Sequence, residues 1–514
     1  MKTTRQAILS TFQKTATTNP LERFADFNVS QFDKLLRNKS EDYWNKQGEQ
    51  KALRVFHESA SNVPAYRDFL KKRRINPEKI NSIEDFKKIP ITTKENYINT
   101  YDIADRCIAG DMSHRLLVAA SSGTSGAPKL WPRGTYQEFE AAAIHELLYT
   151  TLFQIQKYRT LILIGFPMGI YVSGMATTIP SWLVATKKYP VTLLTVGNNK
   201  DEILQVLPSL KGEYEQIIFV GHPFFIKDVL ESARDRSIDF TNQKIRTLFC
   251  SEGFSEEWRD YIASLAPNVD PQRDILSTYG SSELLLMGYE TPFSVALRRE
   301  ITNSSVLQEK ITPQRGIPSV FQYNPLIRYI ESIGNDLLFT SGSGIPLIRY
   351  NIHDSGAVFS SEKFLAHIEN PSKVLQIAMK NRWNLPLVTL DGRSDQTIIF
   401  YAANIYPEHI HAALNQKSFL SKITGKFAIK KEYNKKMDEI LRIYIELRPN
   451  KKPSSQLTAS ISQHIVDTLK AVNLEYLFLW DNLNKDIRPK IALCFYQDSK
   501  FFKPGKKPKY IISS

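Results

Sequence analysis

The 514-residue chain has only three cysteines, and its first twenty residues contain no continuous apolar stretch. Cys107, Cys250 and Cys494 are too far apart in sequence to encode a disulfide framework or a zinc cluster. The N-terminal segment, MKTTRQAILSTFQKTATTNP, does not have the apolar region that a signal peptide needs. We therefore expect a protein of the reducing cytoplasm rather than a secreted, disulfide-bonded one.

Charged residues are missing from residues 160–186, a stretch of 27 positions that is long enough to span a bilayer. Glycines and prolines interrupt this stretch, at Gly165, Pro167, Gly169, Gly174 and Pro180. They indicate a buried strand, a loop and a core helix rather than a membrane span. We expect no membrane partner.

Acidic residues are fewer than basic ones, 53 against 67, which gives a formal net charge of +14. An excess of positive charge favours anionic partners such as nucleotides, although a solvated, lysine-rich surface gives the same composition. The sequence has no zinc-finger spacing, no aromatic RNA-binding signature and no helix-turn-helix pattern. We therefore expect no nucleic-acid partner.

Short apolar runs alternate with helix-length segments between residues 116 and 279. This alternation predicts an α/β fold with a mostly parallel sheet covered by helices, in which ligands gather at the carboxyl ends of the strands. From about residue 317, strands with short turns follow one another. We predict a large α/β domain over residues 1–391 and a small α+β domain over residues 392–514.

The strongest local motif is SSGTSGAPK, residues 121–129, which directly follows the apolar run LLVAA. Its glycines let the backbone turn with amides exposed, and its hydroxyl groups add donors, so the loop can wrap phosphate oxygens. It is not the common phosphate-binding loop, because the pattern G-x-x-x-x-G-K-[ST] is absent. Taken alone, it could equally be a flexible turn.

Four further motifs follow in order: SEGFSEEWRDYI (251–262), STYGSSE (277–283), PLIRYNIHDSG (346–356) and GRSDQTIIFYAANIYPEHI (392–410). Together with the Ser/Gly loop they resemble the adenylate-forming superfamily of acyl-CoA synthetases and ligases, specifically its phenylacetate–CoA ligase branch. The segment from Asn62 to Tyr97, which ends in IPITTKENY, is similar to the opening segment of that branch. The resemblance covers roughly residues 50–512.

This resemblance implies that ATP and Mg²⁺ are cofactors. The Ser/Gly loop, with Thr124 and Lys129, would close over the β- and γ-phosphates; Tyr279 would pack against adenine, and Glu283 would hold Mg²⁺. The other residues implied to bind the nucleotide are Ser121, Ser122, Gly123, Ser125, Gly126, Ser251, Glu252, Gly253, Gly280, Ser281 and Ser282.

The resemblance also assigns the ribose contacts, the hinge and the catalytic cation. Asp354 would accept hydrogen bonds from both ribose hydroxyls, and Arg393 would add a second ribose contact. Asp395 matches the hinge about which the small domain rotates. The C-terminal motif KPGKKPKYI puts Lys506 at the catalytic position, where a cation would stabilise charge at the α-phosphate, but Lys507 or a solvated basic tail are alternatives.

Three residues depart from the pattern of the family, each at a position where relatives commonly carry glycine. Ser251 and His353 lie in the predicted nucleotide site. Ala402 lies in the loop of the small domain at which the backbone must approach coenzyme A closely. The motifs implied for adenylation are therefore present, whereas the identity of the second acceptor stays open.

The segments FPMGIYVSGM and GHPFF would build the pocket for the acid. Their aromatic side chains favour an apolar or aromatic acid, although ordinary core packing gives the same pattern. The predicted substrate residues are Phe166, Tyr171, Gly174, His222 and Phe224.

The leading hypothesis is an AMP-forming ligase that adenylates a small carboxylic acid and transfers it to a thiol, with coenzyme A as the candidate acceptor. A second hypothesis keeps the adenylation but passes the acid to an amine or a carrier protein, or activates an unusual acid for N–N bond formation. A third is a nucleotide-binding protein without turnover. The sequence leaves the oligomeric state open, with a homodimer as one candidate.

Overall fold

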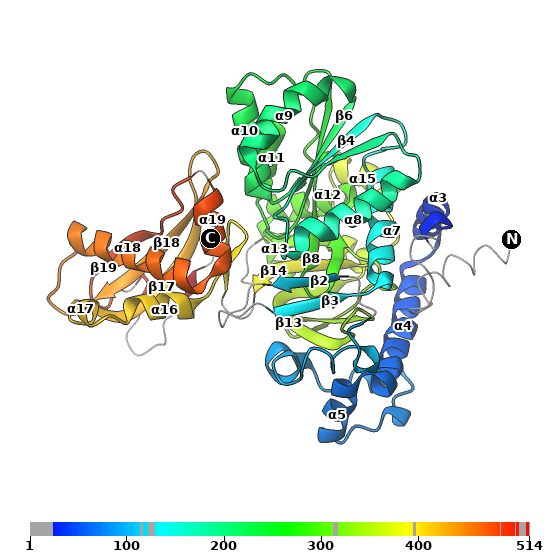
Figure 1. Cartoon of the computed structure of the whole chain (residues 1–514), viewed down its shortest axis with the longest axis horizontal. Coiled ribbons are helices and arrows are strands. Elements are labelled where there is room, and N and C mark those ends of the chain that lie inside the picture. Colours follow the sequence, from blue (N-terminus) through cyan, green and yellow to red (C-terminus); the bar gives the residue numbers. More distant parts are fainter. Residues whose placement is uncertain are drawn as a thin grey trace. The chain divides into compact units, whose positions relative to one another are not determined.

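The computed structural model describes residues 24–113, 117–121, 129–311, 317–393, 397–483, 485–498, 500–502 and 510–512. The chain divides into two compact units (Figure 1). The larger unit comprises residues 1–121 and 130–392, and the smaller one comprises residues 122–129 and 393–514.

A twelve-stranded sheet forms the centre of the larger unit (Figure 1). The strand order is β11-β12-β13-β14-β10-β9-β8-β7-β6-β4-β5, and β1 pairs with β13. The strands are β1 (Thr92–Thr93), β4 (Thr160–Gly165), β5 (Val191–Leu194), β6 (Gln216–Gly221), β7 (Lys244–Phe249), β8 (Ile275–Ser281), β9 (Leu285–Tyr289), β10 (Ser319–Gln322), β11 (Tyr329–Ile333), β12 (Asp336–Ser341), β13 (Leu347–Phe359) and β14 (Leu387–Arg393).

The predicted parallel sheet is confirmed for β5, β4, β6, β7 and β8, whose neighbouring strands all run parallel. Beyond β8 the pairing is mostly antiparallel, because a short turn joins β8 to β9 and hairpins join β11, β12 and β13, whereas the short strand β1 runs parallel to β13. This change occurs at residue 285, earlier than the change near residue 317 that the sequence pattern suggests.

Helices cover both faces of the parallel strands, which explains why β4 and β6 are buried at every position and mainly apolar. Ile162, Ile164, Ile218 and Val220 join a core with residues of α7 and α8, while α10 packs on β6. The helices of this unit are α3 (Val29–Asn38), α4 (Glu41–Asn62), α5 (Pro64–Lys72), α6 (Ile83–Phe86), α7 (Thr135–Thr151), α8 (Val172–Thr186), α9 (Lys200–Leu210), α10 (Pro223–Asp235), α11 (Glu256–Ala263), α12 (Pro292–Thr302), α13 (Ser305–Ile311), α14 (Ser361–Leu365) and α15 (Lys373–Lys380).

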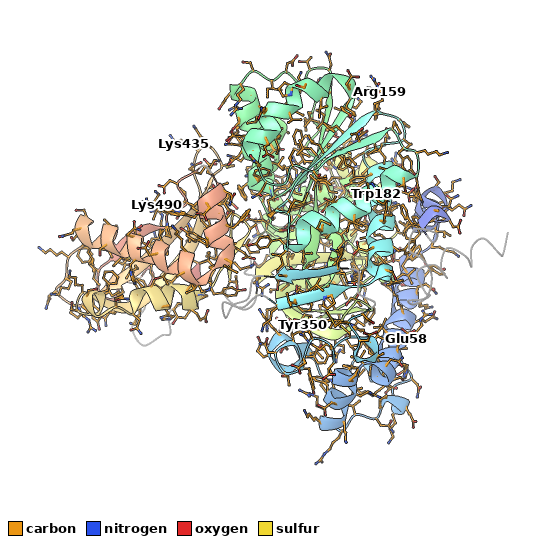
Figure 2. The ribbon with its side chains drawn as sticks, viewed as in Figure 1. Glu58, Arg159, Trp182, Tyr350, Lys435 and Lys490 are labelled. Atoms are coloured by element: carbon orange, nitrogen blue, oxygen red, sulfur yellow. The ribbon has the colours of Figure 1, made fainter. Side chains whose placement is uncertain are left out.

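A second core of the larger unit joins the N-terminal helices to the antiparallel strands. Phe56 of α4 and Tyr66 of α5 belong to the same buried cluster as Phe339 of β12 and Tyr350 of β13, which is labelled in Figure 2. The short strand β1 pairs with β13 beside this cluster. The N-terminal region is therefore built onto the strand that carries Asp354.

The smaller unit is an α+β structure around a four-stranded sheet of order β19-β18-β17-β20. Leu441, Ile443 and Ile445 alternate along β18 and are fully buried, as are Ile461 and Ile465 of α18. The elements of this unit are β15 (Ile398–Phe400), β16 (Ala403–Ile405), β17 (Ile423–Tyr433), β18 (Glu439–Leu447), β19 (Lys490–Cys494), β20 (Ile511–Ile512), α16 (Pro407–Leu414), α17 (Lys417–Leu420), α18 (Ser455–Val472) and α19 (Leu474–Asn482).

Among the described residues, no helix combines the length and the apolar character needed to cross a membrane. The uncharged stretch 160–186 folds as β4, a loop and α8, as its glycines and prolines predict. The outer face of α8 carries Trp182, which is more than half exposed (Figure 2).

Candidate active site

The Ser/Gly loop connects β2 (Leu117–Ser121) to β3 (Lys129–Arg133), which pair as a two-stranded sheet. At the end of β2, the Ser121 hydroxyl oxygen accepts a hydrogen bond from Nε1 of Trp131 at 3.1 Å. Ala120 donates its backbone N–H to the carbonyl of Ile170 at 2.9 Å and forms a β-bridge with Tyr171. The strand that leads into the predicted phosphate loop is thus tied directly to the predicted acid-binding segment.

Several predicted residues lie outside the part of the chain that the structure describes. These residues are Ser122, Gly123, Thr124, Ser125, Gly126, Asp395, Lys506 and Lys507. Their assigned roles stay predictions.

Tyr279 and Asp354, 75 residues apart in sequence, meet in the structure. The Tyr279 hydroxyl donates a hydrogen bond to Oδ2 of Asp354 at 2.5 Å. Both side chains are buried, with exposed fractions of 4% and 8%. The Tyr279 ring stacks on Phe321 of β10, with 5.6 Å between ring centroids and an interplanar angle of 24°. The residues predicted to contact adenine and ribose are therefore in direct contact with each other.

The three departures from glycine share one backbone property. Ser251, His353 and Ala402 all have a left-handed conformation, with φ of 81°, 66° and 68°. Glycine is favoured in this region because a Cβ atom is disfavoured there. The backbone thus takes the conformation that glycine favours, although each of these positions carries a side chain.

The segment IPITTKENY lies beside the strand that carries Asp354. Thr92 of β1 donates its hydroxyl to the carbonyl of Ile348 at 2.8 Å, and Glu95 follows β1 directly. Oε2 of Glu95 lies 3.6 Å from Nε2 of His353. Partial burial would raise the pKa of Glu95, but hydrogen bonds from its own backbone and from Thr93, together with His353, hold the pKa below its usual value. Glu95 is therefore a neighbour of the site that the sequence reasoning did not single out.

Glu283 lies in the turn between β8 and β9, and its side chain is partly exposed. The turn is tight, because a Cβ atom on Gly280 would lie 3.0 Å from the carbonyl oxygen of Leu285. The Ser281 hydroxyl oxygen accepts a hydrogen bond from the backbone N–H of Leu284 at 3.2 Å. A partly exposed carboxylate on a rigid turn suits a hard cation such as Mg²⁺.

Two of the other predicted nucleotide residues lie at the ends of strands, and two lie in the loop between β7 and α11. Lys129 is the first residue of β3 and Arg393 is the last residue of β14. Glu252 is buried, and a Cβ atom on Gly253 would be at ordinary contact distance, 3.4 Å, from the hydroxyl oxygen of Ser319.

The predicted acid-binding residues differ in what they contact. Phe166 packs edge-on against His222, with 5.1 Å between ring centroids. Gly174 of α8 has no room for a side chain, because a Cβ atom would lie 2.3 Å from the carbonyl oxygen of Pro167. Phe224 instead packs against Trp258, at 5.3 Å between centroids, in an aromatic cluster.

His222 is neutral at physiological pH. Burial lowers its pKa to about 4, and a hydrogen bond with the backbone of Cys250 offsets only part of this effect. A neutral imidazole packed against Phe166 gives the surroundings of these two side chains an apolar character with one polar edge. Such an environment favours contact with an uncharged group over contact with a carboxylate.

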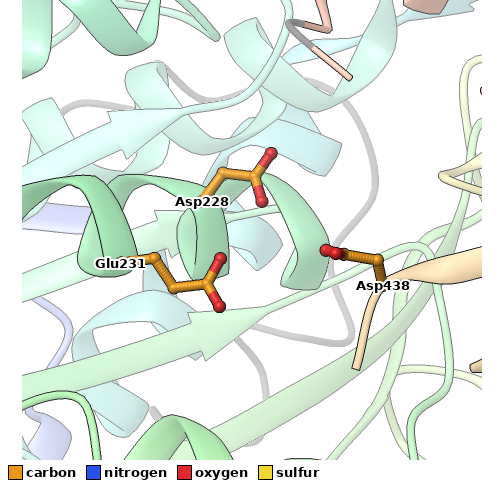
Figure 3. Close-up of side chains that lie close together, drawn as sticks. All are labelled: Asp228, Glu231 and Asp438. Carbon is orange, nitrogen blue, oxygen red and sulfur yellow. The ribbon is translucent and has the colours of Figure 1, made fainter. Parts of the chain in front are cut away.

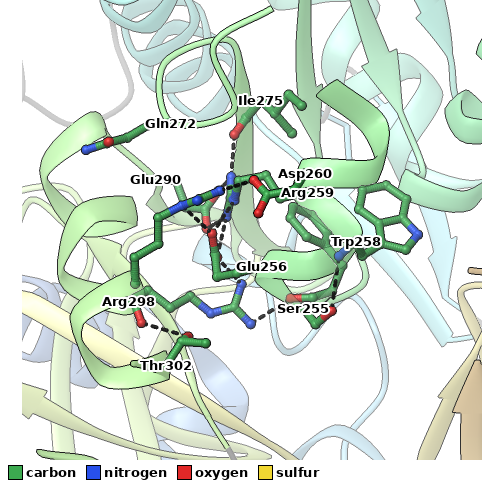
Figure 4. A network of polar contacts seen from close by, with 12 residues as sticks. Ser255, Glu256, Trp258, Arg259, Asp260, Gln272, Ile275, Glu290, Arg298 and Thr302 are labelled. Carbon is green, nitrogen blue, oxygen red and sulfur yellow. Dashed lines mark hydrogen bonds and ion pairs between the residues drawn. The ribbon is translucent and has the colours of Figure 1, made fainter. Parts of the chain in front are cut away.

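A buried network of charged residues supports the segment 251–256 (Figure 4). Arg259 of α11 pairs with Glu256 at 3.0 Å and with Glu290 at 2.7 Å, and Arg298 of α12 pairs with Glu256 at 3.0 Å. Arg298 also donates to the carbonyl of Phe254 at 2.6 Å, and Glu290 accepts from the backbone N–H of Ser277 at 2.8 Å. The network therefore joins the predicted adenine edge to β8.

The network also fixes the charge of Glu256. Burial alone would raise the pKa of this carboxyl group, but the neighbouring Arg259 and Arg298 hold it below its usual value. Sequence reasoning missed these residues, because glutamates and arginines on α11 and α12 look like ordinary solvated helix residues.

Two further carboxylates, Asp228 and Glu231, lie on α10 (Figure 3). Glu231 accepts hydrogen bonds from Lys227, at 3.0 Å, and from the Tyr261 hydroxyl. Asp438, also labelled in Figure 3, belongs to the smaller unit, where it accepts from Lys485 at 2.5 Å. Glu231 and Asp438 are thus engaged as structural charged residues within their own units.

Comparison with known proteins gives weak but consistent similarity. The sequence is 19% identical over 401 residues to a phenylacetate–coenzyme A ligase of Aromatoleum evansii, across 76% of this chain and 78% of the relative. A phenylacetate–coenzyme A ligase of Pseudomonas putida is 20% identical over 403 residues, across 75% and 78%. No protein-family model matches the chain.

The fold is similar to that of 2-hydroxyisobutyryl-CoA ligase. A crystal structure of that protein with 2-HIB-AMP and CoA in the thioesterification state superposes with a TM-score of 0.60 at 16% identity, over 98% of this chain and 94% of that one. Its postadenylation state gives a TM-score of 0.52 at 15% identity, over 94% and 92%. The predicted resemblance to phenylacetate–CoA ligases and the predicted fold are confirmed.

Proposed function

We propose that this chain is an ATP-dependent, AMP-forming ligase that adenylates a small carboxylic acid and transfers it to the thiol of coenzyme A. The observation that carries the proposal is the buried contact between Tyr279 and Asp354. A carboxylate oriented by a tyrosine hydroxyl is a strong acceptor for the vicinal hydroxyls of a ribose, and the aromatic ring beside it would give a base an apolar neighbour.

The residues of the chain fit ATP and Mg²⁺. Asp354 would hold the ribose, the Ser/Gly loop the phosphates, and Glu283 the cation, which supplies charge neutralisation of the triphosphate when bound. In the first half-reaction, the carboxylate of the acid attacks the α-phosphate and pyrophosphate leaves. In the second, a thiol replaces AMP. The domain boundaries 1–391 and 392–514, the hinge at Asp395 and the catalytic Lys506 are parts of this proposal.

The names of the similar proteins support a thiol acceptor and two classes of acid, an arylacetic acid and a small 2-hydroxy acid. The neutral His222 beside Phe166 is compatible with both, because the ring packs against an apolar group and its polar edge can meet a hydroxyl. In this proposal, the turn at Ala402 contacts coenzyme A. An amine or a carrier protein remains the alternative acceptor.

The experiment is pyrophosphate release with a panel of acids that includes phenylacetate and 2-hydroxyisobutyrate, each with ATP and Mg²⁺. Release of pyrophosphate with one of these acids supports adenylation. Faster release on addition of coenzyme A, but not of amines, supports a thiol as the acceptor. Nucleotide binding with no pyrophosphate release from any acid would favour a binding protein without turnover.

The catalytic lysine is tested by comparing Lys506→Ala with Lys507→Ala. Loss of pyrophosphate release from acid plus ATP, with transfer from a preformed adenylate retained, identifies the lysine that acts in the first half-reaction. Full activity of both variants would show that the C-terminal lysines are only a basic surface.

A further inference from the structure

The hairpin formed by β15 and β16 in the smaller unit has an unusual turn. Phe400 pairs with Ala403, which leaves a two-residue loop of Tyr401 and Ala402. Both loop residues have a left-handed backbone, with φ of 46° and 68°. Hairpin loops of this type favour Asn-Gly, because each Cβ atom in the left-handed region is disfavoured. A Tyr-Ala pair therefore needs support from its surroundings.

Glu439, the first residue of β18, gives this support. Its Oε2 accepts a hydrogen bond from the backbone N–H of Tyr401 at 2.6 Å, and its own backbone N–H donates to the Tyr401 hydroxyl at 3.1 Å. Both residues are buried. Oε1 of Glu439 lies 2.6 Å from Nζ of Lys431, which balances the charge of the carboxylate. The reciprocal bonds fix the backbone and the side chain of Tyr401 together.

The second strand of the same hairpin, β16, is held by Asn473 and Glu475 at the start of α19. Asn404 donates its backbone N–H and its side-chain N–H to Oε2 of Glu475, at 2.8 Å and 3.1 Å. The carbonyl oxygen of Asn404 accepts a hydrogen bond from Nδ2 of Asn473 at 2.8 Å. These bonds hold β16, whereas the bonds from Glu439 hold the turn itself.

We propose that Glu439 is a positioning residue for the transfer half-reaction, because it holds the Tyr401–Ala402 turn in the conformation that receives coenzyme A. This inference rests on the proposed function and concerns the acceptor. In the transfer step, the thiol sulfur bonds to the acyl carbon, the bond from that carbon to the AMP oxygen breaks, AMP leaves with the electron pair, and the thiol proton passes to water. Glu439 takes no part in these bond changes.

The test uses the full-length protein and the acid that gives the fastest pyrophosphate release in the panel. Glu439→Ala should raise the KM for coenzyme A, or lower the rate of transfer from preformed adenylate, by about tenfold, as expected for the loss of one charge-assisted hydrogen bond. Pyrophosphate release in the first half-reaction should stay within about twofold of wild type, because the turn is not part of the nucleotide site.

Ala402→Gly provides the rescue that a merely structural role would not show. Glycine adopts the left-handed conformation without support, so adding Ala402→Gly to Glu439→Ala should recover most of the transfer rate. The matched control is Glu432→Ala, which removes a carboxylate from the neighbouring strand β17, where it pairs with Arg442 at 2.6 Å. This control should leave both half-reactions unchanged.

Wild-type transfer in Glu439→Ala, equal loss of both half-reactions, or no rescue by Ala402→Gly would each overturn the proposal. A readout independent of activity separates this result from failure of the proposed function. In urea unfolding, the destabilisation by Glu439→Ala should be smaller in the Ala402→Gly background than in wild type. Additive effects would show that Glu439 does not hold the turn, whether or not any acid is adenylated.

Discussion

Ser251, His353 and Ala402 each carry a side chain on a left-handed backbone. This conformation costs about 1–2 kcal/mol for a residue other than glycine. The sequence presents these residues as departures from a family pattern, whereas the structure shows at all three positions the left-handed conformation that glycine favours. What changes at each position is an added Cβ atom and the group beyond it, such as the His353 imidazole beside Glu95.

At Ser251 we expect glycine to stabilise the protein. The side chain is exposed, so Ser251→Gly loses little contact and removes the left-handed strain, with an expected gain of about 0.5–1 kcal/mol in the free energy of unfolding. Urea unfolding checks this value. The control is Ser232→Gly in the helix α10, which should destabilise by about 0.5 kcal/mol. Destabilisation by both substitutions would contradict the interpretation of Ser251.

At Asp354 we expect a loss of nucleotide affinity. Asp354→Ala removes the charged acceptor that the Tyr279 hydroxyl orients, and each bond from ribose is worth about 1.5–3 kcal/mol. ATP binding measured by titration calorimetry should weaken by at least about tenfold. The exposed Asp239, which accepts from Thr241 in a remote turn, provides the control Asp239→Ala. Wild-type affinity of the Asp354 variant would refute the ribose assignment.

At the scale of elements, α8 shows how close packing fixes the start of a helix. Gly174 lies in its first turn, with the carbonyl of Pro167 and the sulfur of Met168 at 2.3 Å and 2.8 Å from the position that a Cβ atom would take. The segment 166–171 therefore folds back on the helix. The β-bridge between Ala120 and Tyr171 joins this segment to β2, the strand that precedes the Ser/Gly loop. The conformation of the predicted acid-binding segment depends on this glycine.

Gly174→Ala should therefore impair acid binding more than nucleotide binding. A backbone atom at 2.3 Å cannot give way without displacement of the segment, and overpacking of this kind costs about 1–3 kcal/mol. We expect a higher KM for the acid with little change in ATP affinity. Ala185→Gly, at a partly exposed position of the same helix, is the control for helix propensity. An unchanged KM for the acid would remove this segment from the site.

We expect the buried histidine of α7, His145, to make the stability of the protein depend on pH. His145 is buried in this helix, and its Nδ1 donates a hydrogen bond to the carbonyl oxygen of Ala141 at 2.7 Å, because a carbonyl oxygen can only accept. Burial lowers the pKa of His145 to about 4. The unfolded chain therefore binds more protons between this value and about 6.5, so stability is complete above that window and falls as the pH decreases through it.

The measurement is urea unfolding of wild type and His145→Gln at about pH 7.5 and about pH 5. Wild type should lose more stability between the two pH values than the variant, because glutamine does not titrate. Equal losses would mean that His145 does not contribute to the dependence. Other groups, such as His222, act in both proteins alike and cancel in the difference.

How far the sequence could predict the structure differs between elements. The apolar runs of β4 and β6 identify buried parallel strands, because both faces of such strands are covered. The resemblance assigns Tyr279 and Asp354 to one nucleotide site, whereas the hydrogen bond between their side chains is seen only in the structure. The pairs of Arg259 with Glu290 and of Arg298 with Glu256 join residues 31 and 42 positions apart, and no periodicity signals such partners.

At the scale of the whole molecule, the chain divides into two units with separate cores. The buried residues of β4, β6 and α7 belong to one core of the larger unit, and those of β18 and α18 form the core of the smaller unit. Separate cores of this size are expected to unfold in separate cooperative transitions.

Differential scanning calorimetry should therefore show two transitions. Ile443→Ala in β18 should lower the midpoint of one, since loss of a buried isoleucine side chain costs about 2–5 kcal/mol, and Ile218→Ala in β6 should lower the other. ATP with Mg²⁺ should raise the transition that Ile218→Ala lowers, because Tyr279 and Asp354 belong to that unit. A single transition shifted by both substitutions would mean that the two units unfold as one.

The order of strands in the large sheet has a consequence for synthesis on the ribosome. The strands β10 and β14 lie between the two halves of the sheet, although β14 comes last in the chain order of that sheet. Until residues 387–393 have emerged, β10 and β13 each present an edge of unpaired backbone groups to the solvent. Between the emergence of β13, which ends at Phe359, and that of β14, which begins at Leu387, the nascent chain thus carries two open half-sheets, and it is at this stage that protection by chaperones would matter most.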